Sequence, residues 1–304
     1  MAERLTLLGY TLGWRLAGLV PEVVAYGLFS AIADGLWWWH GSAVRQLEAN
    51  LRRVVPGAGD DEIRRLSRAG LRSYLRYWCD VFRLTGWSHD RTVGTVRLVD
   101  GDLLWKAWAQ DRGLVVALAH QGNWDHAGAW STYRLAKVVT VAERLKPAGL
   151  FNRFVAYRES LGMEILPLTG GSSVLPTLVR RVRAGGFVPL LMDRDLTQSG
   201  APVQFFGETA RMAVGPAALA LAARVPLLPV NVHYERLPRG ASSRWGLVIT
   251  MHPPVEVPDA PRQVQIQQMT QACADALAQG IRQHPEDWHM LQRVFDADRE
   301  GQPA

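Results

Sequence analysis

The sequence predicts an α/β fold in which a central mixed sheet is surrounded by helices. After Asp100, short apolar segments rich in β-branched residues alternate with segments of helical periodicity, which is typical of α/β proteins. Several of these short segments are apolar on both faces, as expected of strands that helices cover on both sides. The predicted strands comprise residues 113–119, 137–142, 164–168, 187–192, 227–233 and 247–251.

The 304-residue chain is predicted to form a single domain over residues 1–304. Its length allows one large domain or two small ones, but no internal repeat, low-complexity tract or long Ser/Gly linker marks a boundary. Within the domain we expect an apolar helical region over 1–40, a basic helical region over 41–100 and an α/β core over 101–304. A late helix is expected over 263–280.

The charge and the cysteine content narrow the function classes. The net charge is +6, and a basic surface attracts anionic partners such as nucleic acid, anionic lipid head groups or phosphate-bearing cofactors. No nucleic-acid recognition motif accompanies the charge, so nucleic acid is not expected as a partner.

Cys79 and Cys273 lie far apart in helix-like sequence and predict neither a disulfide framework nor a cysteine metal site. We interpret both as small buried hydrophobic residues.

Within the first forty residues, the stretch 5–39 is apolar but interrupted by three charged residues and one proline (Arg15, Glu22, Asp34 and Pro21). No uninterrupted run approaches the roughly 20 residues that a membrane-spanning helix needs, and the neutral start does not match a signal peptide. We expect two apolar helices separated by Pro21 and ending in the tryptophans 37–39. They either pack as a hairpin on the core or lie in a membrane interface, where indole rings are favoured. Since three adjacent tryptophans cannot all face one core, membrane contact is favoured.

Residues 41–87 have helical periodicity and carry a stripe of arginines. Apolar positions recur every three to five residues between these arginines. The stripe is formed by Arg64, Arg65, Arg68, Arg72 and Arg76. It is either the solvated face of a helix or a contact surface for anionic lipid or a substrate phosphate, and the sequence leaves both interpretations open.

The most informative segment is the buried strand 113–119, which runs directly into the polar sequence HQGNWD. Ligands and catalytic groups of α/β proteins gather where strands end. Asn123 is expected to cap a helix, which places Asp125 in the first helical turn. Because Gly122 allows a sharp turn, the Asp125 carboxylate is predicted to bind one imidazole nitrogen of His120 and leave the other to accept a proton. His120 is then a general base and Asp125 its orienting partner.

No serine or cysteine stands in a recognisable nucleophile motif, since Gly-x-Ser-x-Gly is absent and the two cysteines lack polar neighbours. We therefore predict that His120 activates an acceptor hydroxyl for direct attack, without a covalent intermediate on the protein. His120, Asp125 and His126 are also potential metal ligands. However, the side chains of neighbouring Asp125 and His126 diverge on a helix and no further His or Cys cluster is adjacent, so no metal is expected.

An ordered set of motifs extends over nearly the whole chain. It comprises LGWRL, PEVVA, HQGNWD, VAERLKP, YRESLGMEILPL, a strand ending in DRDL, FFGE and a Gly-Pro helix start. This set resembles the bacterial lysophospholipid acyltransferase superfamily. The resemblance is strongest to the phosphatidylinositol mannoside acyltransferases of actinobacteria, with the lipid A late acyltransferases as more distant relatives. The His-x4-Asp spacing is common by itself, whereas the ordered set is specific.

The resemblance implies a fold of the glycerol-phosphate acyltransferase type, attached peripherally to the cytoplasmic face of the plasma membrane. It implies that a palmitoyl-like group comes from acyl coenzyme A, a donor substrate and not a permanently bound cofactor. The implied acceptor is a mannose hydroxyl of a phosphatidylinositol mannoside. The alternatives are another glycolipid or lysophospholipid acceptor, hydrolysis with water as the nucleophile, or lipid binding without catalysis.

Four polar residues are carried over from the family's site region. His120 is the base and Asp125 its partner, while Glu143 and Arg158 match polar positions of the VAERLKP and YRES motifs. In this interpretation Arg158 holds the thioester carbonyl or a polar group beside it, and Glu143 fixes the guanidinium through a bidentate pair. A purely structural ion pair is the alternative.

The chain departs from the family pattern at one position. The family has Glu-Arg-Asp where this chain has Asp193, Arg194 and Asp195. Asp193 is predicted to be catalytic, with a shorter reach than the family's glutamate, and Arg194 and Asp195 are predicted to bind substrate.

The segment 200–207 is expected to be a loop after that strand. Its paired residues Phe205 and Phe206 either line an acyl tunnel or anchor the core. Arg194 and Arg211 are the candidates for binding the phosphates of coenzyme A.

Overall fold

The computed structural model describes residues 18–110, 112–143, 148–168, 174–195 and 200–298. A five-stranded sheet runs through its centre, with the strands β8 and β9 antiparallel and the other neighbouring pairs parallel. In spatial order the strands are β1 (Val96–Val99), β9 (Trp245–Met251), β8 (Leu227–Arg236), β2 (Leu114–Leu118) and β5 (Phe187–Leu191). The predicted α/β fold with a central mixed sheet is confirmed.

Two pairs of strands lie outside this sheet. The parallel pair β3 (Val139–Ala142) and β4 (Glu164–Pro167) lies beside β5, to which it is joined by a backbone bridge between Val138 and Phe187. The strands β6 (Ala201–Phe205) and β7 (Glu208–Met212) form an antiparallel hairpin. The predicted loop over 200–207 is therefore wrong. Buried and exposed side chains alternate along β6, and this period of two was the signal of a strand.

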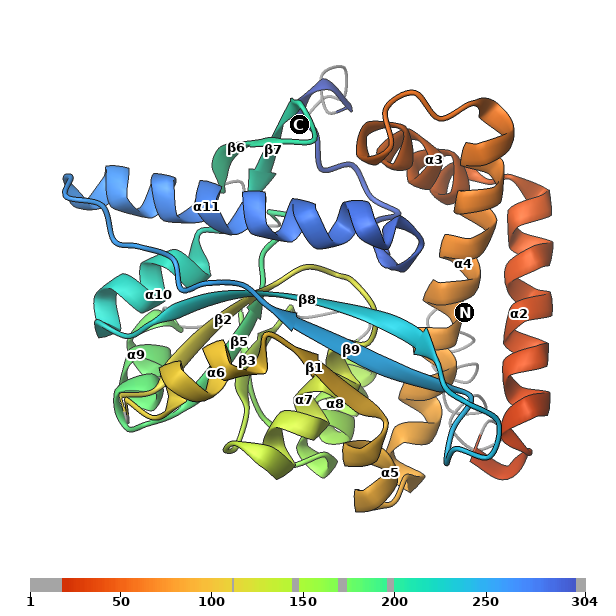
Figure 1. The fold of residues 1–304 in the computed structure, drawn as a ribbon, viewed down its shortest axis with the longest axis horizontal. Coiled ribbons are helices and arrows are strands. Elements are labelled where there is room, and N and C mark those ends of the chain that lie inside the picture. The colour runs from red at the N-terminus through yellow and green to blue at the C-terminus, as the bar shows by residue number, and fades with distance from the viewer. Residues whose placement is uncertain (1–17, 111, 144–147, 169–173, 196–199, 299–304) are drawn as a thin grey trace.

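Helices cover both faces of the central sheet (Figure 1). The helices α5 (His89–Gly94), α6 (Gly101–Trp108), α7 (Trp124–Arg134) and α8 (Ala148–Ser160) lie on one side. The other side is covered by α9 (Leu175–Arg183), α10 (Gly215–Ala223) and α11 (Arg262–Gln283), whose buried residues share one core cluster. Along β2, alternate side chains belong to two different core clusters, which explains why this strand is apolar on both faces.

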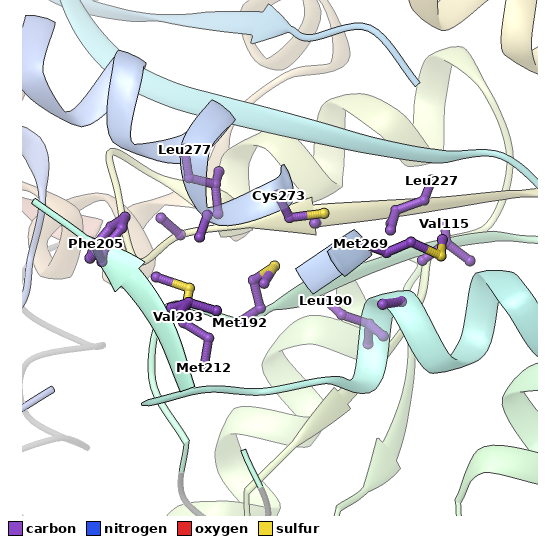
Figure 2. Packing of buried hydrophobic residues seen from close by; sticks show 14 of the residues in the cluster. Val115, Leu190, Met192, Val203, Phe205, Met212, Leu227, Met269, Cys273 and Leu277 are labelled. Carbon is purple, nitrogen blue, oxygen red and sulfur yellow. The ribbon is translucent and has the colours of Figure 1, made fainter. Parts of the chain in front are cut away.

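The late helix α11 packs directly on the sheet. Figure 2 shows its residues Met269, Cys273 and Leu277 in one buried cluster with the strand residues Val115 and Leu227. Cys79 and Cys273 are both buried, as predicted. Burial raises the pKa of the Cys273 thiol to about 12, so the thiol stays protonated at neutral pH.

A helical layer stands at one end of the sheet, formed by α2 (Glu22–Trp39), α3 (Ser42–Val54) and α4 (Asp60–Arg83) (Figure 1). Two residues of the arginine stripe hold this layer together, because Arg68 and Arg72 both bind the Asp34 carboxylate of α2. Their hydrogen bonds hold the pKa of Asp34 well below its usual range. A third, Arg64, donates to Glu48 of α3 at 2.7 Å.

The three tryptophans that end α2 do not share one environment. Trp37 faces the protein, where its indole N–H donates to Ser67 at 3.0 Å, while Trp38 and Trp39 are 82% and 77% exposed. Further exposed apolar side chains on α2 are Val23, Val24, Leu28, Ile32 and Leu36. The helix predicted before Pro21 lies outside the described residues, apart from residues 18–20. Among the described helices, none has the length and apolar character required to cross a bilayer.

Candidate active site

His120 meets Asp193 at the carboxyl edge of the sheet. The parallel strands β2 and β5 pair with Leu118 opposite Leu191, so the chain positions two residues beyond each strand lie side by side. The His120 Nδ1 atom is 2.6 Å from Asp193 Oδ1, and the His120 backbone N–H donates to Asp193 Oδ2 at 2.9 Å. The order of the strands in the sheet thus brings the Asp193 carboxylate into contact with His120, although the two residues are 73 positions apart in the chain.

Asp193 is completely buried and accepts a third hydrogen bond, from the Trp288 indole N–H at 2.9 Å. Burial alone would raise the pKa of this carboxyl, but the charge and hydrogen bonds of His120, with the Trp288 donor, lower the pKa below its usual value. An ionised Asp193 holds a proton on Nδ1 of His120, which leaves a lone pair on Nε2. A carboxylate-oriented imidazole of this kind has the geometry of a general base.

The turn after His120 has the local structure that the sequence predicts. Asn123 caps α7 by accepting a hydrogen bond from the backbone N–H of His126 at 2.9 Å. Gly122 has a φ of +61°, and a Cβ atom at this position would lie 2.5 Å from the Val232 carbonyl oxygen. Glycine is therefore required here by both the backbone conformation and the close approach of β8.

The predicted pairing of Asp125 with His120 is wrong. Asp125 Oδ1 accepts from Arg158 Nε at 2.6 Å, and its Oδ2 accepts from the Tyr77 hydroxyl at 2.8 Å. Because the Asn123 cap starts the helix, the Asp125 side chain projects from the first turn of α7 toward α4 and α8. Asp125 therefore joins three helices, and Asp193 takes the orienting position on His120.

Arg158 is bound by Asp125, so the proposed bidentate pair with Glu143 does not form. Burial alone would lower the pKa of the Arg158 guanidinium, but Asp125 and Tyr77 raise the pKa above its usual value. Burial, and next the charge of Asp125, raises the pKa of Tyr77, which keeps its hydroxyl as a donor. Glu143 is exposed and makes no hydrogen bond or ion pair within the described part of the chain.

A pocket of about 570 Å³ opens in front of His120. It brings together six of the predicted site residues, namely His120, Asp125, Glu143, Arg158, Arg194 and Asp195. Much of the remaining wall is apolar and comes from α4, α8 and the region of β3, with Trp78, Val138, Val141, Phe151 and Phe154 among its residues. The pocket thus combines a histidine base with a surface suited to an alkyl chain.

The two predicted phenylalanines do not line this pocket. Phe205 is buried in β6, where its ring lies 5.8 Å from Trp288 and 6.4 Å from Phe295, measured between centroids. Phe206 turns the hairpin with a φ of +52°, and its ring also packs near Trp288. Of the two interpretations, the structure supports core anchoring.

The remaining predicted residues have different positions. Arg211 lies in β7, pairs with Asp296 at 3.2 Å and does not line the pocket, so it is not placed to bind a ligand there. Arg194 does line the pocket and its guanidinium donates to the Gln292 side chain. Asp195 accepts from the Gly200 backbone N–H at 2.8 Å, which links it to the residue directly before β6.

Two polar residues of the pocket, Tyr77 and His289, were not predicted from the sequence. His289 is buried; its backbone N–H donates to the His120 carbonyl at 2.8 Å, and its Nε2 lies 3.0 Å from the Ser73 hydroxyl. The His289 Nδ1 atom is buried without a hydrogen-bond partner among the described residues. No spacing signal joins these positions to His120, since Tyr77 comes from α4 and His289 from the last segment of the chain.

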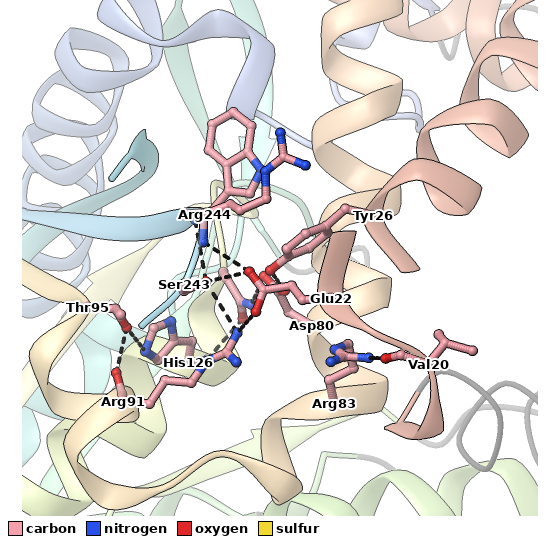
Figure 3. Close-up of polar contacts among 12 residues, drawn as sticks. Val20, Glu22, Tyr26, Asp80, Arg83, Arg91, Thr95, His126, Ser243 and Arg244 are labelled. Atoms are coloured by element: carbon pink, nitrogen blue, oxygen red, sulfur yellow. Dashed lines mark hydrogen bonds and ion pairs between the residues drawn. The ribbon is translucent and has the colours of Figure 1, made fainter. Parts of the chain in front are cut away.

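His126 points away from His120. Its Nε2 lies 2.9 Å from the Thr92 carbonyl oxygen. The same atom lies near the Thr95 hydroxyl (Figure 3). His120, Asp125 and His126 therefore do not converge on one point. Burial lowers the pKa of His126 to about 4, so the folded protein keeps this imidazole neutral.

This buried histidine predicts a loss of stability in mild acid. In the unfolded chain its pKa is about 6.5, so between pH 6.5 and 4 the unfolded state binds a proton that the folded state does not. The contribution of His126 is complete above pH 6.5 and falls as the pH decreases, by roughly 2 kcal/mol between pH 7 and 5. We expect urea unfolding to show a smaller loss over this range in His126→Gln, whose amide also donates to Thr92. Equal losses in both proteins would contradict the assignment.

Comparison with known proteins identifies the class to which this fold and site belong. Residues 3–296 match the family described as bacterial lipid A biosynthesis acyltransferase. The chain therefore belongs to this family, and the protein is an acyltransferase.

The names of individual relatives are more specific than the description of the family. The chain is 42% identical over 299 residues to the phosphatidylinositol mannoside acyltransferase of Mycolicibacterium smegmatis, covering 98% of this chain and 94% of the relative. It is also 42% identical over 295 residues to the enzyme of the same name from Mycobacterium tuberculosis, covering 95% and 88%. A solved structure, the 1-acyl-sn-glycerophosphate acyltransferase PlsC of Thermotoga maritima, aligns with a TM-score of 0.39 and 13% identity over 86% of this chain and 97% of that one.

Proposed function

We propose that this acyltransferase moves a palmitoyl-like group from acyl coenzyme A to a mannose hydroxyl of a phosphatidylinositol mannoside, with His120 as the general base. The observation that carries the proposal is that His120, paired with the buried Asp193, lines a pocket with an apolar wall. The acceptor is taken from the names of relatives that are 42% identical over nearly the whole chain. The donor is taken from the resemblance of the motifs to those of acyl coenzyme A-dependent enzymes.

The reaction needs one base and no nucleophile from the protein. The acceptor hydroxyl donates to Nε2 of His120, which takes the proton as the oxygen attacks the thioester carbonyl carbon. The new ester bond forms, the carbon–sulfur bond breaks, and the imidazolium returns the proton to the leaving thiolate of coenzyme A. Asp193 stabilises the imidazolium between these two transfers. Arg158 and Asp125 position α8 against α7 and keep the pocket wall in place.

The acyl chain is proposed to lie along the apolar wall formed by α4, α8 and β3. Trp78, Phe151 and Phe154 supply aromatic surface there, and Val138 and Val141 supply the aliphatic part. An extended alkyl chain gains about 0.8 kcal/mol for each methylene group that it buries. This wall replaces Phe205 and Phe206 as the candidate acyl site.

Peripheral attachment to the cytoplasmic face of the plasma membrane is part of the proposal. Val24, Leu28, Ile32 and Leu36 are spaced four residues apart on α2 and are all exposed, so they form one apolar line along the helix. Trp38 and Trp39 stand exposed at its end. An apolar helix face with terminal indole rings is suited to lie in the plane of a membrane interface.

A mass-spectrometric assay tests donor and acceptor together. The purified protein is mixed with palmitoyl coenzyme A and phosphatidylinositol mannoside, and the products are fragmented to locate the new ester. We expect a palmitoyl ester on a mannose and one equivalent of free thiol. His120→Ala is the negative control, and His89→Ala, which removes an exposed histidine from α5, is the matched positive control.

Two results would overturn the proposal. Release of free palmitate at the same rate with and without the acceptor would indicate a hydrolase. Binding of the lipid with no consumption of thioester across phosphatidylinositol mannoside, other glycolipids and lysophospholipids would indicate a lipid-binding protein. Transfer to one of the other acceptors alone would agree with the acyltransferase activity but contradict the mannose hydroxyl as the acceptor.

A further inference from the structure

A second pocket, of about 610 Å³, lies among α2, α4, the β8–β9 end of the sheet and the short helix η2 (Pro285–Asp287). It shares no lining residue with the pocket at His120. Ser73 of α4 stands between the two, because its hydroxyl contacts Asp287 on the wall of the second pocket and His289 on the wall of the first. Six arginines line it, namely Arg65, Arg68, Arg72, Arg76, Arg236 and Arg244. We call it the arginine pocket.

The acidic groups near these arginines are largely engaged elsewhere. Two carboxyl groups line the arginine pocket, those of Glu286 and Asp287. Asp287 is buried and binds the Ser73 hydroxyl and the Tyr234 backbone N–H, and burial raises its pKa. Glu286 lies 3.8 Å from the His284 ring. Asp34, outside the lining, compensates only Arg68 and Arg72. The arginine pocket therefore carries an excess of positive charge.

Several guanidinium groups in the arginine pocket have N–H donors that are available to bind a ligand. Within the described chain, the side chains of Arg65, Arg76 and Arg236 form no hydrogen bond or ion pair. The guanidinium carbons of Arg76 and Arg236 lie 3.6 Å and 4.7 Å from the Trp245 ring centroid, and Arg76 also lies over Tyr234. Stacking on an aromatic face fixes the plane of a guanidinium while its N–H edge stays free to bind an anion.

The rim of the arginine pocket is anchored to α2. Figure 3 shows Glu22 between Arg91, Ser243 and the backbone of Arg244, and the Glu22 carboxylate accepts hydrogen bonds from all three. The loop that carries Arg244 is therefore held against the helix that contributes Tyr26, Gly27 and Ser30 to the lining. This arrangement positions charges from both ends of the chain around one space.

We propose that the arginine pocket binds the phosphate of an anionic phosphate ester, the head group of a membrane phospholipid. Arginine clusters match phosphate because each guanidinium donates two parallel hydrogen bonds to its oxygens. The same α2 that lines the pocket exposes Leu28 and Ile32. We therefore expect a lipid that contacts these apolar side chains to present its head group to the arginines. A soluble phosphate ester offers the same chemistry, and the experiment separates the two sources.

The test uses a variant that removes charge without removing a hydrogen bond or an ion pair between described residues. Arg65→Gln/Arg236→Gln deletes two exposed arginines of the pocket that form no ion pair with the described residues. Arg180→Gln/Arg262→Gln is the matched control, since both arginines are exposed and lie on α9 and at the start of α11, away from α2 (Figure 1). Binding is measured by sedimentation with phosphatidylcholine vesicles with and without phosphatidylinositol, and by calorimetry with adenosine 3′,5′-bisphosphate.

We expect phosphatidylinositol to increase vesicle binding. The pocket variant should bind these vesicles about tenfold more weakly than the wild type, whereas the control variant should bind them with unchanged affinity. If calorimetry alone shows the tenfold loss, the phosphate comes from a soluble ester and the site is retained. Equal losses in the pocket and control variants, or no loss in either arm, would overturn the site. These measurements do not involve acyl transfer, so they stand independently of the proposed reaction.

Discussion

Replacement of Asp193 by asparagine is expected to lower kcat by about 10³ to 10⁴-fold, in line with the loss seen when the carboxylate of a histidine-based catalytic site is replaced by an amide. The two Asp193 oxygens accept from three donors: Oδ1 from His120 Nδ1, and Oδ2 from the His120 backbone and the Trp288 indole. Asparagine has only one side-chain oxygen. This oxygen accepts from both the His120 backbone N–H and the Trp288 indole N–H if the NH₂ group faces His120 Nδ1.

That orientation reverses the tautomer of the imidazole. With an NH₂ donor at Nδ1, the ring proton moves to Nε2, and the lone pair that accepts the substrate proton is lost. The opposite orientation would leave two buried N–H groups facing an NH₂ group, at a cost of roughly 1–3 kcal/mol for each unsatisfied donor. The first orientation is therefore favoured, and catalysis fails while the fold persists.

Three measurements check this expectation. Steady-state kinetics should give a similar low kcat for Asp193→Asn, His120→Ala and the double variant, because the two residues act as a unit. The ¹⁵N shifts of the His120 ring should report the tautomer, and thermal unfolding should show a retained fold. Asp275→Asn, at an exposed position of α11, is the matched control. If the losses of the single variants multiply in the double variant, the two residues act independently and the pairing has no catalytic role.

The sequence predicted those features that depend on local pattern. Apolar runs located six of the strands, and the strand β2 is buried on both faces as the lack of alternation indicated. The Asn123 cap and the sharp turn at Gly122 follow from side-chain chemistry and backbone conformation within a few residues. Strand β1 has four residues and was too short to stand out from the helical segments beside it.

The partner of His120 could not be found by the same means. Asp125 is five residues away and suggested a pair, whereas Asp193 is brought to His120 by the adjacency of β2 and β5, which no local pattern encodes. Its position directly after a strand was the available signal, and it placed Asp193 at the site without assigning its contact. The same limit applies to Arg158, because its ion pair with Asp125 depends on how α8 packs against α7.

Removing the positive charge of Arg158 is expected to destabilise the protein by about 3–5 kcal/mol, the range observed when one member of a buried ion pair is deleted. Asp125 is 2% exposed in its side chain and Arg158 is 17% exposed, so water compensates little of the Asp125 charge when the guanidinium is removed. In Arg158→Gln the Asp125 carboxylate keeps only the Tyr77 hydroxyl among its two observed partners. An uncompensated charge then remains between α4, α7 and α8.

A double-mutant cycle separates this structural role from a direct contact with substrate. Asp125→Asn/Arg158→Gln leaves two neutral amides that can bind each other, so the free energy of unfolding in urea should be partly restored relative to Arg158→Gln. Arg97→Gln breaks the exposed pair with Glu235 and should cost less than about 1 kcal/mol, which makes it the matched control. If Arg158→Gln keeps the stability of the wild type and loses only acyl transfer, Arg158 acts on the substrate and Asp125 does not need it for folding.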